Sequence, residues 1–302
     1  MKSVPADLKF VPARAVQAPF LGVIGGSGLY EMEGLTRVTR VRVTTPFGPP
    51  SDAIVVGDLE GVRVAFLARH GRGHRLSPSE INYRANIYAL KKLGVERVVS
   101  VSAVGSMKEA LHPGHVVIPH QFYDQTKRRI GTFFERGLVA HVALADPVCR
   151  DAAGKLAEAA RKCGATVHEG GVYLCIEGPQ FSTRGESLIY RQWGVDVIGM
   201  TNLPEAKLAR EAQLCYATLA LVTDYDCWHP GHDAVTVDAV IETLQRNVAL
   251  SRQIIRTVVP TLTGDRPCAC ARALETAVLT PRNQIPAATR KRLSLFLDKK
   301  GA

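Results

Sequence analysis

Residues 217–226 read Ala-Thr-Leu-Ala-Leu-Val-Thr-Asp-Tyr-Asp, an apolar run that ends on two acids. The uninterrupted apolar residues predict a buried strand, and open α/β sheets hold their ligands at the carboxyl ends of such strands. We therefore expect Asp224 and Asp226 to face a ligand, where carboxylates accept hydrogen bonds from ring nitrogens or an exocyclic amine. Burial would raise the pKa of one acid and make it a proton donor. A turn that closes the strand is the alternative interpretation.

Strand and helix patterns alternate from Leu21 to about Pro260. This alternation predicts an α/β fold, a single domain with a central mixed, largely parallel β-sheet covered by helices. We expect the domain to span residues 19–262, with an N-terminal extension at 1–18 and a C-terminal extension at 263–302. The predicted strands are 21–25, 62–68, 98–102, 172–176 and 217–222, and the predicted helices are 81–93, 151–163, 204–214 and 237–258.

The composition limits the classes of partner. The chain has 302 residues, of which 46% are hydrophobic, and a formal net charge of +10. Its basic residues are scattered, so we expect a small anion such as phosphate as partner and no nucleic acid. No apolar run reaches the roughly 18 residues of a membrane helix, and the N-terminus lacks the apolar core of a signal peptide. The expected location is the cytoplasm, without a membrane partner.

The seven cysteines are an odd number. Cys268 and Cys270 form a Cys-Ala-Cys motif, a spacing too short for a zinc knuckle, and no second pair is evident to complete four ligands. We expect ordinary thiols there, with redox activity as the alternative. The other five cysteines lie in apolar or helical segments, which is typical of reduced, buried thiols. They are Cys149, Cys163, Cys175, Cys215 and Cys227.

Other predicted strand ends carry groups that suit phosphate. Gly25-Gly26-Ser27-Gly28 lets backbone N–H groups and a hydroxyl converge on an anion, although it matches neither a dinucleotide fingerprint nor a P-loop and a tight turn is the alternative. Arg69-His70 follows the strand at 62–68, and a guanidinium binds an oxyanion through two parallel hydrogen bonds. Glycines around His70 argue against a zinc-binding helix. Two further groups with hydroxyls end later strands, Ser102-Ala103-Val104-Gly105-Ser106 and Met200-Thr201-Asn202.

The chain resembles the S-methyl-5'-thioadenosine phosphorylases of the purine nucleoside phosphorylase superfamily. The shared blocks occur in order from about residue 20 to 260. They include Gly25-Gly26-Ser27-Gly28-Leu29, Thr45-Pro46-Phe47-Gly48, Leu67-Ala68-Arg69-His70-Gly71, Asn82-Tyr83, Ile176-Glu177-Gly178-Pro179, Phe181-Ser182 and Thr223-Asp224-Tyr225-Asp226-Cys227-Trp228.

The resemblance implies a role for each matching residue. The implied phosphate ligands are Ser27, Arg69, His70, Ser102, Ala103 and Thr201. Met200 would lie against the ribose and Phe181 against the purine, and Ser182 would also bind the substrate. Asp224 and Asp226 would hold the adenine, one accepting from the 6-amino group and the other supplying the proton that N7 needs. Val237 would line the methylthio pocket, and His141 would reach that pocket from a neighbouring subunit.

The resemblance also implies the reaction, phosphate-dependent cleavage of S-methyl-5'-thioadenosine to adenine and 5-methylthioribose 1-phosphate in purine and methionine salvage. Inorganic phosphate is a co-substrate, and no metal or organic cofactor is implied. A homo-oligomer, specifically a trimer, is expected. Phosphorylases for 6-oxopurines have an asparagine where this chain has Asp224, because an amide can donate to O6 and a carboxylate cannot. Asp224 therefore favours a 6-aminopurine over the alternative of a methylthioinosine or other purine nucleoside phosphorylase. From another class, the alternative is a basic nucleic-acid-binding protein.

Overall fold

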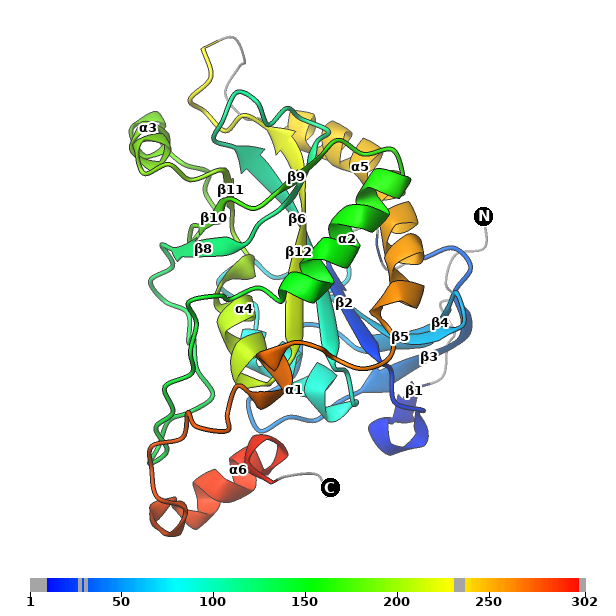
Figure 1. The fold of residues 1–302 in the computed structure, drawn as a ribbon, viewed down its shortest axis with the longest axis vertical. Coiled ribbons are helices and arrows are strands. Elements are labelled where there is room, and N and C mark those ends of the chain that lie inside the picture. Colours follow the sequence, from blue (N-terminus) through cyan, green and yellow to red (C-terminus); the bar gives the residue numbers. More distant parts are fainter. Residues whose placement is uncertain (1–9, 27–28, 30–31, 231–236, 299–302) are drawn as a thin grey trace.

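A mixed β-sheet with helices on both faces forms the fold, seen in the computed structural model in Figure 1, which describes residues 10–26, 29, 32–230 and 237–298. The described residues form one twelve-stranded sheet in the order β1-β3-β4-β5-β2-β6-β11-β10-β8, with β12 paired to β6 and to β7, and β9 paired to β7. Its strands are β1 (Phe10–Pro12), β2 (Leu21–Gly25), β3 (Thr36–Arg42), β4 (Ile54–Leu59), β5 (Val62–Ala68), β6 (Arg97–Ser106), β7 (Val116–Ile118), β8 (Gln121–Asp124), β9 (Val167–Glu169), β10 (Val172–Cys175), β11 (Val197–Gly199) and β12 (Cys215–Asp224).

The centre of the sheet is parallel. β2 runs parallel to β5 and β6, and β12 runs parallel to β6. The antiparallel pairs are β3 with β4, β4 with β5, β11 with β6, and β12 with β7. The predicted mixed, largely parallel sheet is therefore confirmed. The strands that were not predicted are β1, β3, β4, β7, β8, β9 and β11, of which β3 and β4 pair antiparallel beside β5.

Helices cover the two faces of the sheet. Alternate residues of β5 point to opposite faces, so Val64 and Phe66 belong to one hydrophobic cluster while Ala65 and Leu67 belong to the other. The first cluster also contains buried residues of α2 and α5, and the second contains those of α1 and α4. The helices are α1 (Tyr83–Lys92), α2 (Arg150–Lys162), α3 (Arg184–Gln192), α4 (Asn202–Glu211), α5 (Val237–Val258) and α6 (Ala287–Leu297).

The segment after Thr263 packs back onto the domain. Arg97, whose side chain is buried, donates from Nη2 to the carbonyls of Gly264 and Asp265 at 3.1 and 2.7 Å. Further on, the ring of Phe296 in α6 lies 4.6 Å from that of Phe133 between ring centroids. None of the helices in the described part of the chain combines the length and apolar character that crossing a membrane requires.

Candidate active site

The two acids lie at the carboxyl end of β12, where the strand has a bulge. Val222 pairs with Val104, but Asp224 pairs with the next residue of β6, Gly105, so Thr223 is the extra residue. A bulge re-aims the side chains that follow it. The Thr223 hydroxyl donates to the Asp224 carboxylate at 2.6 Å, and the backbone N–H of Asp226 donates to the other oxygen of Asp224 at 2.8 Å. The bulge therefore gathers both acids at one point.

Burial raises the pKa of both carboxyl groups. For Asp224, the loss of solvent is the largest cause of the raised pKa, and the negative charge of Asp226 raises the pKa further. The hydrogen bonds from Thr223 and Asp226 act in the opposite direction. Burial is likewise the largest cause of the raised pKa of Asp226, which is 6% exposed. Asp226 also has a positive φ of 53°, a conformation that aspartate tolerates but that is uncommon outside turns and functional sites. These are the properties of acids placed for proton exchange.

Gly105 provides the space that Asp224 occupies. A Cβ atom at this position would lie 2.8 Å from Oδ1 of Asp224 and 3.1 Å from Cγ2 of Ile198. Only glycine lets β6 pass this close to the carboxylate. From the sequence, Gly105 is only part of a strand-end group without a role of its own. Its role was not predicted because Asp224, which it approaches, is far away along the chain.

The loop after β10 faces the acids. The thiol of Cys227 donates to the carbonyl of Ser182 at 3.3 Å, which joins the two segments directly. Phe181, next to Ser182, has a side chain that is 46% exposed in the single chain. A flat, accessible aromatic ring on this loop is suited to stack on a planar base.

Arg129 organises the neighbouring strand end, although the sequence analysis gave it no role. Its buried guanidinium donates from Nη1 to the carbonyls of Met200 and Leu203, at 2.6 and 2.7 Å, and from Nη2 to the carbonyl of Glu177 at 2.6 Å. The charged group thus stabilises the backbone around Met200 and the loop that leads to Phe181. No local sequence signal distinguishes Arg129 from the adjacent basic residues, which are solvent-facing or half-buried.

Arg69 is held by a residue that the sequence analysis did not single out. Its Nε and Nη2 face the carboxylate of Glu205 at 3.0 and 3.1 Å, and Nη1 donates to the carbonyl of Val101 at 2.9 Å. Both side chains of the ion pair are almost fully buried, and Ser100 and Tyr216 also donate to Glu205. Burial alone would lower the pKa of Arg69, but the Glu205 carboxylate raises it. The two-nitrogen edge expected to bind phosphate therefore faces Glu205, and phosphate contact by Arg69 stays a prediction.

His70 is buried in its neutral form. Its Nδ1 lies 2.8 Å from the carbonyl of Leu76, and because a carbonyl only accepts, Nδ1 carries the proton and Nε2 has a free lone pair. Burial lowers the pKa of His70 to about 4, and the charges of Arg69, His74 and Arg129 act in the same direction. Near neutral pH this ring is a hydrogen-bond acceptor at Nε2.

The state of His70 predicts acid sensitivity. A histidine with a pKa of about 6.5 when unfolded and about 4 when folded favours folding above pH 6.5, and this contribution is lost as the pH falls toward 4. The loss is on the order of 3 kcal/mol. We expect His70→Asn, which cannot titrate, to flatten the dependence of the melting temperature on pH between 6.5 and 4. Parallel profiles for the two proteins would show that His70 does not drive the acid sensitivity.

The other proposed phosphate residues lie on the same part of the sheet. Ser102 is buried within β6, with its Oγ 3.1 Å from the hydroxyl of Tyr173, and Ala103 follows it. Thr201 is buried and directly precedes α4, whose first turn is interrupted at Leu203 (φ −120°, ψ 135°). Ser27 lies outside the described residues.

The predicted roles of His141 and Val237 are not tested by the described contacts. His141 is exposed, and its backbone N–H donates to the carbonyl of Ala277 in the C-terminal segment at 2.8 Å. Val237 is the first residue of α5, but its side chain is not among those that the structure describes. Their substrate roles therefore stay predictions.

The chain is similar to known phosphorylases. The model of the phosphorylase superfamily matches residues 20–260. A Geobacter sulfurreducens protein named S-methyl-5'-thioadenosine phosphorylase is 60% identical over 278 residues, covering 92% of this chain and 97% of that protein. A methylthioadenosine phosphorylase structure from an Antarctic soil metagenomic library is 53% identical, with a TM-score of 0.89 and coverage of 93% of this chain and 99% of that chain.

A structure with a bound nucleoside is also similar. It is a point variant of adenosine/methylthioadenosine phosphorylase from Schistosoma mansoni in complex with methylthioadenosine. That chain is 38% identical, with a TM-score of 0.77, and the match covers 85% of this chain and 96% of that chain. This chain therefore belongs to the phosphorylase superfamily and, within it, to the family of S-methyl-5'-thioadenosine phosphorylases.

Proposed function

We propose that this protein cleaves S-methyl-5'-thioadenosine with inorganic phosphate, giving adenine and 5-methylthioribose 1-phosphate. The observation that carries the proposal is the pair of buried acids with raised pKa, Asp224 and Asp226, at the end of β12 and beside the loop of Phe181. The relatives' names support the substrate, and the acid at position 224 favours a 6-aminopurine because a carboxylate accepts from an amino group.

The two acids match the demands of the bond that breaks. When the bond between C1' and the purine opens, its electron pair goes to the base and positive charge develops on the sugar, as in glycoside cleavage. One acid delivers a proton to N7 of the departing adenine, and the other accepts from its 6-amino group. Because an ordinary aspartic acid has a pKa of roughly 3.9, the raised pKa at this site keeps a proton available closer to neutral pH.

Phosphate completes the reaction on the other side of the sugar. One of its oxygens forms the new bond to C1', and its negative charge stabilises the sugar cation beforehand. Ser102, Ala103 and Thr201 are suited to hold it, because the hydroxyls of Ser102 and Thr201 can donate to a phosphate oxygen. His70 presents the lone pair of Nε2, which is the group that binds the remaining proton of hydrogen phosphate. Neither step requires a metal or organic cofactor.

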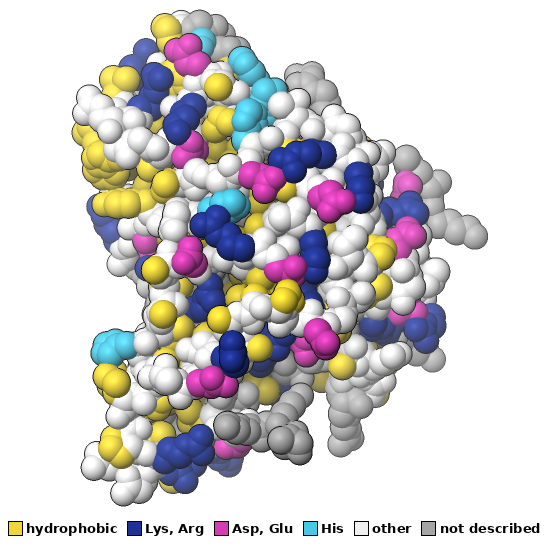
Figure 2. All heavy atoms as spheres, in the orientation of Figure 1, with side chains coloured by type: hydrophobic (Ala, Val, Ile, Leu, Met, Phe, Trp, Pro, Cys, Tyr) yellow, Lys and Arg dark blue, Asp and Glu magenta, His cyan; other side chains and the backbone are white. Residues whose placement is uncertain are grey.

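The active protein is a homo-oligomer in this proposal, and specifically a trimer in the cytoplasm that serves purine and methionine salvage. His141 is exposed in the single chain, as a residue that serves a neighbour's methylthio pocket must be. Hydrophobic side chains also gather at the upper left of Figure 2, where Figure 1 shows α3, and the exposed ones there include Leu188, Ile189 and Trp193. Such a patch is typical of an interaction surface.

A single assay tests the function. We expect adenine release from methylthioadenosine to depend on phosphate and to exceed base release from methylthioinosine and from adenosine. Stronger turnover of methylthioinosine would reassign the protein to that substrate. Release without phosphate would indicate hydrolysis in place of phosphorolysis. Salt-sensitive RNA binding without turnover would favour the nucleic-acid alternative, which the mixture of positive and negative side chains on the face in Figure 2 does not support.

A further inference from the structure

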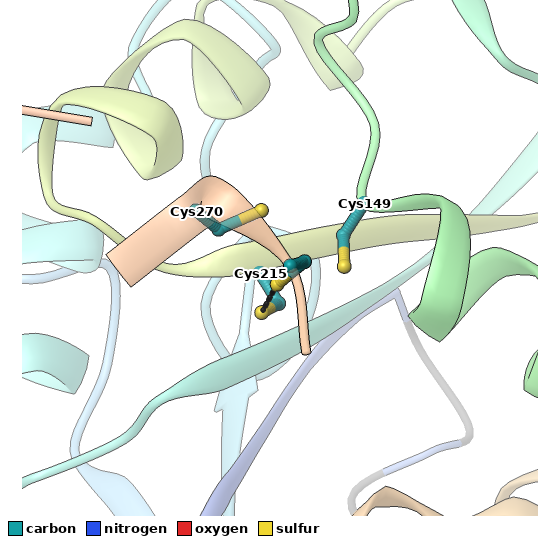
Figure 3. Close-up of side chains that lie close together, drawn as sticks. Cys149, Cys215 and Cys270 are labelled. Carbon is teal, nitrogen blue, oxygen red and sulfur yellow. Dashed lines mark hydrogen bonds between the residues drawn. The ribbon is translucent and has the colours of Figure 1, made fainter. Parts of the chain in front are cut away.

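Four cysteines from three distant parts of the chain meet at one point, shown in Figure 3. The sulfur atoms of Cys149, Cys215, Cys268 and Cys270 all lie within 4.8 Å of one another. Cys149 precedes the first turn of α2, and Cys215 is the first residue of β12. In the C-terminal segment, Cys268 directly precedes the short 3-10 helix Ala269–Arg272, and Cys270 lies within it. The expectation that the Cys-Ala-Cys motif has no second pair was therefore wrong, because folding supplies Cys149 and Cys215.

We propose that these four cysteines bind one zinc ion as a tetrahedral tetrathiolate site. Zinc prefers four thiolates in this geometry at closed structural sites, and each thiol gives up its proton to solvent when the ion binds. Three of the side chains belong to residues that are at most 3% exposed, and Cys268 is half-buried, which gives the ion a route of entry.

The distances fit such a site. With zinc–sulfur bonds of about 2.3 Å, the sulfur atoms of a tetrahedron are about 3.8 Å apart. The sulfur atoms of Cys215 and Cys268 are 3.3 Å apart, and no pair exceeds 4.8 Å, so adjustments of about 1 Å or less accommodate the ion. The same 3.3 Å separation is far longer than the roughly 2.05 Å of a disulfide bond, and all four cysteines are free thiols.

Nearby groups compensate the charge of the site. Four thiolates around a divalent ion leave two negative charges, which must be stabilised in a buried position. Nη1 of Arg210 donates to the sulfur of Cys270 at 3.5 Å. Cys149 is the N-cap residue of α2, and the N-terminus of a helix favours a thiolate. The guanidinium of Arg210 thus stabilises the thiolate of Cys270, and the N-terminus of α2 stabilises that of Cys149.

The position of the site indicates a structural role. Cys215 begins β12 and Asp224 ends it, so the zinc site and the acids are separated by nine residues of strand, or roughly 30 Å. The ligands join α2 and β12 to the C-terminal segment, which Arg266 also secures by donating to the carbonyl of Gln213 at 3.0 Å. We expect the ion to fasten that segment to the domain without touching the substrates.

The first test measures metal content. The full-length protein is purified under reducing conditions, loaded with Zn²⁺ and freed of excess ion, and zinc is then counted by mass spectrometry together with the free thiols. We expect one zinc per chain in the wild type and loss of it in Cys268→Ser and Cys270→Ser. Cys163→Ser is the matched control, because Cys163 directly follows α2, lies near Thr257 and is outside the cluster. This variant should keep its zinc.

The second test separates a metal site from ordinary thiols. Co²⁺ bound in place of zinc should give the thiolate-to-cobalt charge-transfer and tetrahedral absorption bands in the wild type and in Cys163→Ser, but not in Cys268→Ser. Chelation should lower the melting temperature and leave the KM values for phosphate and nucleoside unchanged. Absence of metal after loading, with four reactive thiols or with two disulfides, would overturn the proposal. Zinc content and the cobalt spectrum are both independent of the catalytic function.

Discussion

Asp224→Asn is expected to lower kcat/KM for methylthioadenosine by about 10–10²-fold, the usual contribution of a hydrogen bond to a charged group. The asparagine lacks the carboxylate that accepts from the 6-amino group, and its amide would place a donor opposite that group. The same amide can donate to O6, so preference should shift toward 6-oxopurine nucleosides such as methylthioinosine. Initial rates with both nucleosides at saturating phosphate give the two efficiencies and their ratio.

The fold should survive this substitution. Oδ1 of the amide can still accept from the backbone N–H of Asp226, and the Thr223 hydroxyl can turn to the carbonyl of Val104, 3.2 Å away. Asp151→Asn is the matched control, because Asp151 lies on α2 and pairs with Lys155. Its kinetics should equal those of the wild type. Unchanged efficiency and selectivity in Asp224→Asn would remove this residue from the base-binding site.

Glu205→Gln is expected to destabilise the protein by about 3–5 kcal/mol, because it leaves the buried charge of Arg69 without its partner. The substitution keeps the shape of the side chain, so the loss reports the charge and not a cavity. Arg69→Ala should destabilise to a similar degree for the reciprocal reason, which makes it unsuitable as a test of phosphate binding alone. Denaturant unfolding of the variants and the wild type measures the difference.

An exposed ion pair provides the control for Glu205. Arg256 donates to Glu60 at 2.6 Å, but both side chains are about two-fifths exposed. Surface pairs contribute about 0–1 kcal/mol, so Glu60→Gln should change stability little. Added phosphate should raise the melting temperature of Glu205→Gln more than that of the wild type if the anion binds beside Arg69. Equal stability of Glu205→Gln and wild type would contradict the importance of the buried pair.

The sequence by itself determined the fold class and the two acids. Hydrophobic patterns with the period of strands and helices depend on neighbouring residues, and for this reason β2, β5, β12, α1, α2 and α4 are close to their predicted bounds. Asp224 and Asp226 were identifiable because an apolar strand that ends on two acids is a local signal. β3 and β4 were missed. They contain Arg37, Arg40 and Asp58 among their apolar residues, and their antiparallel pairing depends on neighbours in space.

Only the tertiary structure decided which distant residues support the site. Glu205 lies 136 residues from Arg69, and a buried carboxylate and guanidinium become partners only when α4 packs on the sheet. Gly105 was decisive because its missing Cβ leaves room for a carboxylate from another strand. The four cysteines were separated by up to 121 residues along the chain, from Cys149 to Cys270, and appeared as unrelated thiols. Their common function as a ligand set depends on distances in space, which the spacing of residues along a chain does not contain.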